Sequence, residues 1–257
     1  MNPFSFLFLA SLAAGAPSDP GAANVSTCCA PRSDETGSIT GKFVWEGERP
    51  EPKPKLTIKE TETTGCKHGG SGVDAEDHSL MIDANGGVGN VVVTVTVKDT
   101  PPAVPADPIV MDQLGCKFDP RVIVVPVGGT LRFGNSDETN HNIHTFAKKN
   151  QPMNKQVAGG SNLDIKLDKA EVVDVKCDVH TWMKAFVFVT DASKWAVTST
   201  DGSFKLEGLP PGEYVLDYWH EELGKGKTEK VVVEAGKTAM VEHKLSAKKE
   251  GGGKRKR

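Results

Sequence analysis

Short runs of alternating apolar and β-branched residues follow one another from residue 37 to residue 245, and no segment keeps a helical period for more than two turns. The runs are Ile39–Trp45, Val91–Val97, Val122–Val127, Thr130–Phe133, Ile143–Phe146, Leu163–Leu167, Val172–Cys177, Ala185–Thr190, Ser203–Leu206, Tyr214–Trp219, Val231–Glu234 and Ala239–Leu245. Turn-forming groups such as Gly128-Gly129 and Pro210-Pro211-Gly212 separate them, in a chain of 257 residues with 27 glycines and 16 prolines. A period of two predicts half-buried strands joined by tight turns. We therefore expect an all-β fold built of sandwiches.

The body of the chain divides near residue 192. Residues 107–192 contain a cluster of potential metal ligands, and residues 193–245 form a compact meander pattern. A module as small as residues 193–245 is marginally stable alone, so we expect this module to pack on the rest of the chain or to take strands from the rest of the chain. Residues 39–43 and 91–97 could supply those strands, which would make this module discontinuous, with the other domain inserted in it. The placement of the whole region 37–106 stays open.

Both ends of the chain differ from the body. Residues 1–16 contain the run FSFLFLASLAAGA, which ends in small residues as a secretory signal does, so we expect export to a periplasm, a cell surface or the medium. Residues 17–36 are rich in Gly, Ala, Ser and Pro and are expected to form a linker. Residues 246–257 hold six Lys or Arg against one Glu, a net charge of +5, and are expected to be disordered.

The charge distribution bears on partners. The whole chain has a formal charge of −3, so the part outside the basic tail carries −8, which argues against a body that binds nucleic acid. The tail itself is either simply solvated or contacts a membrane surface or an acidic partner.

A thiol, an imidazole and a thioether fall within one seven-residue loop, CDVHTWM, between two predicted strands. Cys177 and His180 are close enough to bind one ion from a turn, and Met183 can approach it from the end of the loop. Thiolate and thioether are soft donors that suit Cu(I), imidazole suits both oxidation states of copper, and zinc rarely takes a thioether. This donor set predicts copper.

A further ligand is expected from the segment NHNIH, residues 140–144, at the start of a strand. Successive strand residues face opposite sides, so only one of His141 and His144 can face the Cys177 loop. We expect it to be His141, because the polar turn before it places that histidine at the end of the sheet. The alternative is a core cysteine beside a histidine and a methionine that merely pack.

These residues resemble the cupredoxin family, and most closely its plastocyanin and amicyanin group. His141-Asn142 resembles the strand start in which a histidine followed by asparagine binds copper, and the Cys-x2-His-x2-Met spacing resembles the short loop of amicyanin. The resemblance covers residues 107–192 and implies a Greek-key β-sandwich with one type 1, or blue, copper site. It implies that Asn142 ties the two ligand loops together by hydrogen bonds and that His144 is structural. The implied ligands are His141, Cys177, His180 and Met183.

A second resemblance concerns residues 195–245. The turns DGSF (201–204) and LPPGEY (209–214) resemble those of the carboxypeptidase-regulatory-like or transthyretin-like β-sandwich module, which implies no catalytic residue. The whole arrangement resembles exported bacterial plastocyanin-like proteins.

The other four cysteines allow several states. Cys66 and Cys116 each follow a glycine, and in an oxidising compartment they could form a disulfide; free thiols or a second metal site are the alternatives. Cys28 and Cys29 are adjacent, which rarely allows a bond between them, so they are intermolecular, lipidated or incidental.

The sequence favours a one-electron carrier between protein redox partners over an enzyme. A multicopper oxidase needs His-x-His pairs and a His-Cys-His bridge, but Cys177 is flanked by Lys176 and Asp178. Trp182, between two ligands, either packs on the sheet or offers an apolar docking surface. The competing function is a non-enzymatic copper-binding or cell-surface module outside the cytoplasm.

Overall fold

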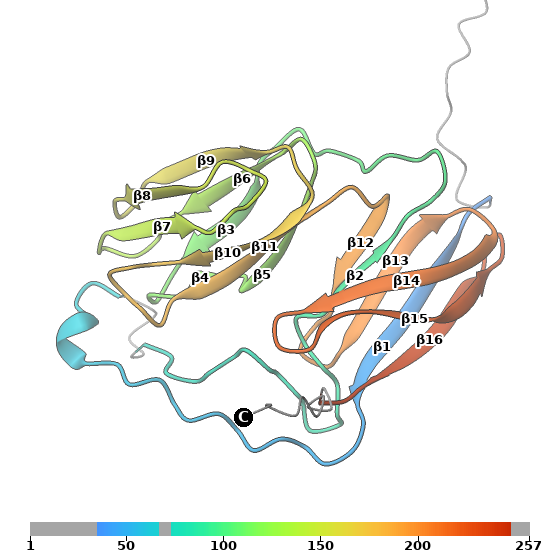
Figure 1. The fold of residues 1–257 in the computed structure, drawn as a ribbon, viewed down its shortest axis with the longest axis horizontal. Helices are drawn as coiled ribbons and strands as arrows, with labels where there is room; N and C mark the ends of the chain where they lie inside the picture. The colour runs from blue at the N-terminus through green and yellow to red at the C-terminus, as the bar shows by residue number, and fades with distance from the viewer. Residues whose placement is uncertain (1–34, 67–72, 248–257) are drawn as a thin grey trace, which may run out of the picture. The chain divides into compact units, whose positions relative to one another are not determined.

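The computed structural model describes residues 35–66 and 73–247. Within these residues the chain is strand, turn and loop apart from one single-turn 3-10 helix, η1 (Glu60–Glu62), and the strands form four sheets (Figure 1). The predicted all-β sandwich fold is confirmed. No helix in this described part is long and apolar enough to cross a membrane.

Several predictions concern residues that are not described. The expected signal segment 1–16, most of the linker 17–36, Cys28 and Cys29, and most of the basic tail 246–257 lie outside the described residues.

The first sandwich contains the predicted metal ligands and consists of two sheets. One has the strand order β5-β11-β10-β7-β8 and the other the order β4-β3-β6-β9. The strands are β3 (Ile109–Gln113), β4 (Phe118–Asp119), β5 (Val122–Pro126), β6 (Gly129–Gly134), β7 (His141–Thr145), β8 (Met153–Val157), β9 (Asn162–Leu167), β10 (Glu171–Lys176) and β11 (Lys184–Thr190). One core lies between the sheets, and it includes Leu131, Phe133, Ile143 and Val175, each fully buried.

The second sandwich takes strands from both ends of the described chain. Its sheets have the orders β13-β1-β16 and β12-β2-β14-β15. The strands are β1 (Gly37–Trp45), β2 (Val92–Val95), β12 (Lys194–Val197), β13 (Ser203–Leu209), β14 (Gly212–His220), β15 (Gly224–Val233) and β16 (Thr238–Leu245). Strand β1 runs antiparallel to β13 and parallel to β16. The early strands thus complete the C-terminal module, which is the discontinuous arrangement that the sequence left open.

Alternation explains why β1 lies where it does. Its residues alternate between buried and partly exposed, with Ile39 and Phe43 fully buried in the core of the second sandwich. Phe43 also packs its ring against Phe204 and Tyr218. An isolated meander of residues 193–245 would leave this face open to water, so burial by β1 and β2 supplies apolar area that the module needs.

Strand β5 is apolar on both faces because it contacts two cores. Ile123 and Val125 face the core of the first sandwich, whereas Val122 and Val124 join a separate cluster with Trp219 of β14. A strand that is covered on both faces has a continuous apolar sequence instead of an alternating one. The β5 sequence VIVVP is continuous in this way, and all five residues are buried.

His220, at the end of β14, gives a testable pH dependence. Its ring is fully buried, and this burial lowers its pKa to about 4. Between about pH 6.5 and pH 4, His220 is therefore protonated in the unfolded chain but neutral in the folded chain. This group contributes stability above pH 6.5, and that stability is lost as the pH falls toward 4. We expect the loss to be about 3 kcal/mol.

Chemical denaturation at pH 7 and pH 4.5 measures this effect. The unfolding free energy of His220→Gln should fall less between the two pH values than that of the unaltered protein. Equal losses in both proteins would contradict the assignment.

Candidate metal centre

Strand register brings the predicted ligands to one end of the first sandwich. His141 begins β7, Cys177 directly follows β10, and β7 and β10 pair antiparallel through His144 and Lys176. Strands β10 and β11 pair through Lys176 and Lys184, which closes the loop 177–183 at the same edge. The loop is further closed by the Met183 N–H, which donates to the His180 carbonyl at 2.8 Å.

Three donor atoms converge from these two loops. Nδ1 of His141 and Nδ1 of His180 are 2.9 Å apart, and the Cys177 Sγ lies 3.9 Å from the first and 3.7 Å from the second. The point equidistant from the three atoms falls inside their triangle, about 2.1 Å from each. Histidine nitrogen and cysteine sulfur hold a first-row metal ion at about 2.0 to 2.3 Å, so the three donors fit one ion.

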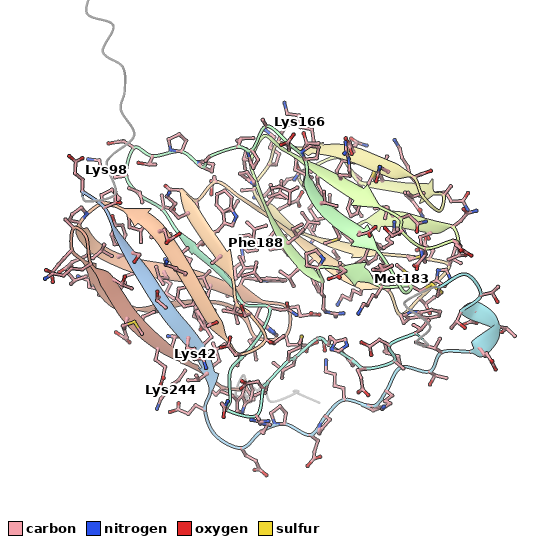
Figure 2. All side chains as sticks on the ribbon, turned by 180° about the vertical axis from the view of Figure 1, so that it is seen from behind. Lys42, Lys98, Lys166, Met183, Phe188 and Lys244 are labelled. Atoms are coloured by element: carbon pink, nitrogen blue, oxygen red, sulfur yellow. A yellow bond between two sulfur atoms is a disulfide. The ribbon has the colours of Figure 1, made fainter. Side chains whose placement is uncertain are left out.

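The fourth predicted ligand, Met183, lies in the same core. Its side chain is 1% exposed and belongs to the apolar cluster that includes Cys177. Figure 2 shows Met183 at the end of the first sandwich. His141, Cys177 and His180 are 0%, 2% and 3% exposed, so the whole ligand set is shielded from water.

Asn142 connects the two ligand loops. Its Oδ1 accepts the Asp178 N–H at 2.7 Å and lies 3.2 Å from the Cys177 Sγ. Its Nδ2 donates to Asn154 and to the Asp178 carboxylate. These bonds hold the start of β7 against the Cys177 loop.

His144 faces away from the cluster, as strand alternation predicts. Its Nδ1 lies 2.9 Å from the Asp178 carboxylate, its ring stacks on Phe146, and its side chain is 32% exposed. Trp182 is partly buried, and its Nε1–H donates to the Cys116 carbonyl at 2.9 Å while its ring meets that of His180 edge to face.

Sequence reasoning missed Asp137, which is 2% exposed. The His141 Nε2 lies 2.9 Å from one carboxylate oxygen of Asp137, and the backbone N–H groups of Gly115 and Cys116 donate to the carboxylate at 2.7 and 2.8 Å. A carboxylate at Nε2 holds a proton on that nitrogen, so Nδ1 is the nitrogen that a metal would bind. The available signal was an acidic residue four positions before the histidine, in the turn that precedes β7.

Hydrogen bonds set the protonation state of the cluster. Burial by itself would raise the pKa of the Cys177 thiol, but hydrogen bonds from His141 and His180 outweigh it and lower the pKa to about 5. Burial would likewise lower the pKa of His141, but its bonds to Asp137 and Cys177 raise it. The sulfur is therefore held as a thiolate at neutral pH, the form that binds metals.

This thiolate can be titrated directly. In the metal-free protein, the ultraviolet thiolate absorbance that Cys177→Ser removes should appear with a midpoint near pH 5. An ordinary cysteine titrates at about pH 8.5. A difference titration between the two proteins measures the midpoint, and a value of about 8.5 or above would contradict the hydrogen-bonding account.

A disulfide joins Cys66 and Cys116. Cys66 ends the described part of the connection that leaves β1, and Cys116 precedes β4, so the bond fastens the long segment between β1 and β2 to the first sandwich. Among the described cysteines, Cys177 is the one free thiol.

Comparison with known proteins gives partial matches. A family model described as polysaccharide lyase family 4, domain II, matches residues 169–241, which start before β10 and end within β16. It lends no support to the resemblance of residues 195–245 to the carboxypeptidase-regulatory-like module, which stays a prediction. Curated proteins gave no match.

Solved structures that match include several described as cupredoxins or copper proteins. The Cu-containing nitrite reductase (NirK) from Thermus scotoductus SA-01 has 23% identity and a TM-score of 0.32, covering 38% of this chain and 25% of its own. This chain thus spans about a quarter of that reductase. Amicyanin from Paracoccus versutus has 25% identity and a TM-score of 0.30, covering 38% of this chain and 97% of its own. A purple cupredoxin from Nitrosopumilus maritimus has 20% identity and a TM-score of 0.29, covering 33% of this chain and all of its own.

Proposed function

We propose that this protein is a one-electron carrier with a single type 1 copper ion. The observation that carries the proposal is the convergence of His141 Nδ1, Cys177 Sγ and His180 Nδ1 around one point. Met183 would be the weak axial donor, completing the set that defines a blue-copper site.

Copper bound there would supply a centre that changes between Cu(I) and Cu(II) without any bond being made to a substrate. The residues around the ligands favour that change because they keep the ligand positions the same in both oxidation states. Asp137 fixes the tautomer and orientation of His141, and Asn142 holds the Cys177 loop against β7. Donors locked in this way reorganise little between the two oxidation states, which favours fast electron transfer.

Burial supports a carrier rather than an enzyme. A catalytic metal site keeps one coordination position open to substrate, whereas these four side chains are each at most 3% exposed. We therefore propose protein redox partners and no substrate. We also propose a location outside the cytoplasm, which the N-terminal apolar run and the Cys66–Cys116 disulfide favour.

A visible spectrum tests the proposal against the alternative of a copper-binding or surface module. One equivalent of Cu(II) should give an intense band at about 600 nm, from charge transfer between thiolate and copper, that ascorbate bleaches and reoxidation restores. A colourless adduct, or none, would favour the binding module.

The axial position has its own test. Met183→Leu replaces a weak axial sulfur donor, which stabilises Cu(II), with a hydrocarbon side chain, so the reduction potential should rise. The colour should remain, because the Cys177 thiolate is kept. We expect a rise of about 60 mV or more, equivalent to a tenfold change in the Cu(II)/Cu(I) equilibrium. Spectroscopic redox titration measures it, and an unchanged or lower potential would exclude Met183 as a ligand.

A further inference from the structure

The Cys66–Cys116 disulfide lies against the predicted copper centre. A sulfur of each cysteine and a ring nitrogen of His180 all lie within 4.8 Å of one another. Cys116 is fully buried, His180 is 3% exposed and Cys66 is 9% exposed. Two sulfurs and one imidazole nitrogen are thus already gathered beside the first cluster, and they share His180 with it.

The elements of the metal centre hold Cys116 in place. Asp137, which also holds His141, accepts the Cys116 N–H at 2.8 Å. Trp182, inside the ligand loop, donates its Nε1–H to the Cys116 carbonyl at 2.9 Å. These bonds do not depend on the disulfide, so Cys116 should keep its position when the bond is reduced.

Backbone contacts also hold the Cys66 side. The Gly65 carbonyl accepts the Glu138 N–H at 3.1 Å, in the turn that carries Asp137. A Cβ on Gly65 would lie 3.0 Å from the Thr139 side chain, so this close approach needs glycine. The Cys66 N–H donates to the Thr63 carbonyl in the turn after η1. The Cα atoms of the two cysteines are 5.1 Å apart, which leaves two reduced sulfurs within reach of one ion.

We propose that reduction of the disulfide creates a second soft-metal site, in which the thiolates of Cys66 and Cys116 and the imidazole of His180 bind Cu(I). Two thiolates and one imidazole form a donor set that suits Cu(I). The site needs neither Cys177 nor His141, so it goes beyond the proposed carrier function. His180 belongs to both sets.

The reductant is a dithiol. One of its thiolates attacks the Cys66 sulfur, the more exposed of the two, and forms a mixed disulfide while Cys116 leaves as a thiolate. The second thiol of the reductant then displaces Cys66, so that the protein gains two thiols and the reductant becomes a cyclic disulfide. Binding of Cu(I) releases the two thiol protons to solvent.

The experiment uses the full chain with Cys28→Ser, Cys29→Ser and Cys177→Ser. These changes remove the other thiols and the predicted blue site, so a failure here is separate from a failure of the proposed function. One of two equal samples of the protein is reduced with dithiothreitol, and the dithiothreitol is then removed under anaerobic conditions. Both samples then compete with bicinchoninate for Cu(I), and circular dichroism checks that each is folded.

We expect the reduced form to bind one Cu(I) per chain at least tenfold more tightly than the disulfide form. Further change of His180→Ala should weaken that binding at least tenfold, and X-ray absorption should show two sulfur ligands. Equal affinity in both redox forms, no effect of His180→Ala, or a reduced chain that unfolds would overturn the proposal.

Discussion

Cys177→Ser is expected to abolish the visible absorption of the copper-loaded protein. The band arises from electron transfer between thiolate and Cu(II), and a serine hydroxyl is neither ionised at neutral pH nor soft. Copper affinity should fall by more than the roughly 100-fold that loss of an outer partner causes, because a primary ligand is lost. The spectrum at one equivalent of Cu(II), followed by chelator competition, measures both effects.

His144→Ala is the matched control for this prediction. His144 belongs to the same strand as His141, but its ring contacts Asp178 and Phe146 instead of the cluster. This variant should keep the band and the affinity, whereas His141→Ala should lose the band. Loss of colour in His144→Ala alone would show that the wrong histidine was chosen.

Asp137→Asn is expected to weaken copper binding by about 10 to 100-fold, the range for loss of a carboxylate behind a histidine ligand. An amide has one acceptor oxygen, whereas the two carboxylate oxygens of Asp137 accept hydrogen bonds from His141 Nε2 and from the N–H groups of Gly115 and Cys116. The histidine would lose its fixed tautomer or the Cys116 loop would lose a bond. Chelator competition measures affinity, and the unfolding free energy of the metal-free protein is measured separately.

Asp164→Asn is the control for that variant. Asp164 lies on β9, its side chain is 42% exposed, and it pairs with Arg132 at the surface. Its change should leave copper affinity unaltered. If both variants bind copper as the unaltered protein does, Asp137 does not position His141.

The sequence predicted the strands in which the order of apolar and polar residues follows the buried and exposed faces. Alternation in β1 and the unbroken apolar run of β5 each follow from the faces that they bury. It did not predict β8, whose segment MNKQV is mostly exposed and lacks a pattern, nor did it predict β3 or the shorter strands β4 and β12. Edge and short strands are specified by pairing with neighbours far along the chain, which local patterns do not encode.

The predicted ligands were accessible from sequence because their chemistry is concentrated in two short segments. A thiol, an imidazole and a thioether within seven residues restrict the metal. Alternation allows only one of His141 and His144 to face the loop, and the polar turn before His141 favours that histidine. Asp137 escaped because an aspartate in a turn is common, and its role depends on the loop of Cys116, distant in sequence. The nearness of the disulfide to His180 was hidden for the same reason.

X-ray absorption at the copper edge tests the central claim most directly. In disulfide-intact protein carrying Cys28→Ser and Cys29→Ser, loaded with one equivalent of Cu(II), the account predicts one short copper–sulfur bond and two copper–nitrogen bonds. The short sulfur bond should vanish in the same protein with Cys177→Ser. A copper environment of nitrogen and oxygen alone before that change would contradict the convergence of His141, Cys177 and His180 on one ion.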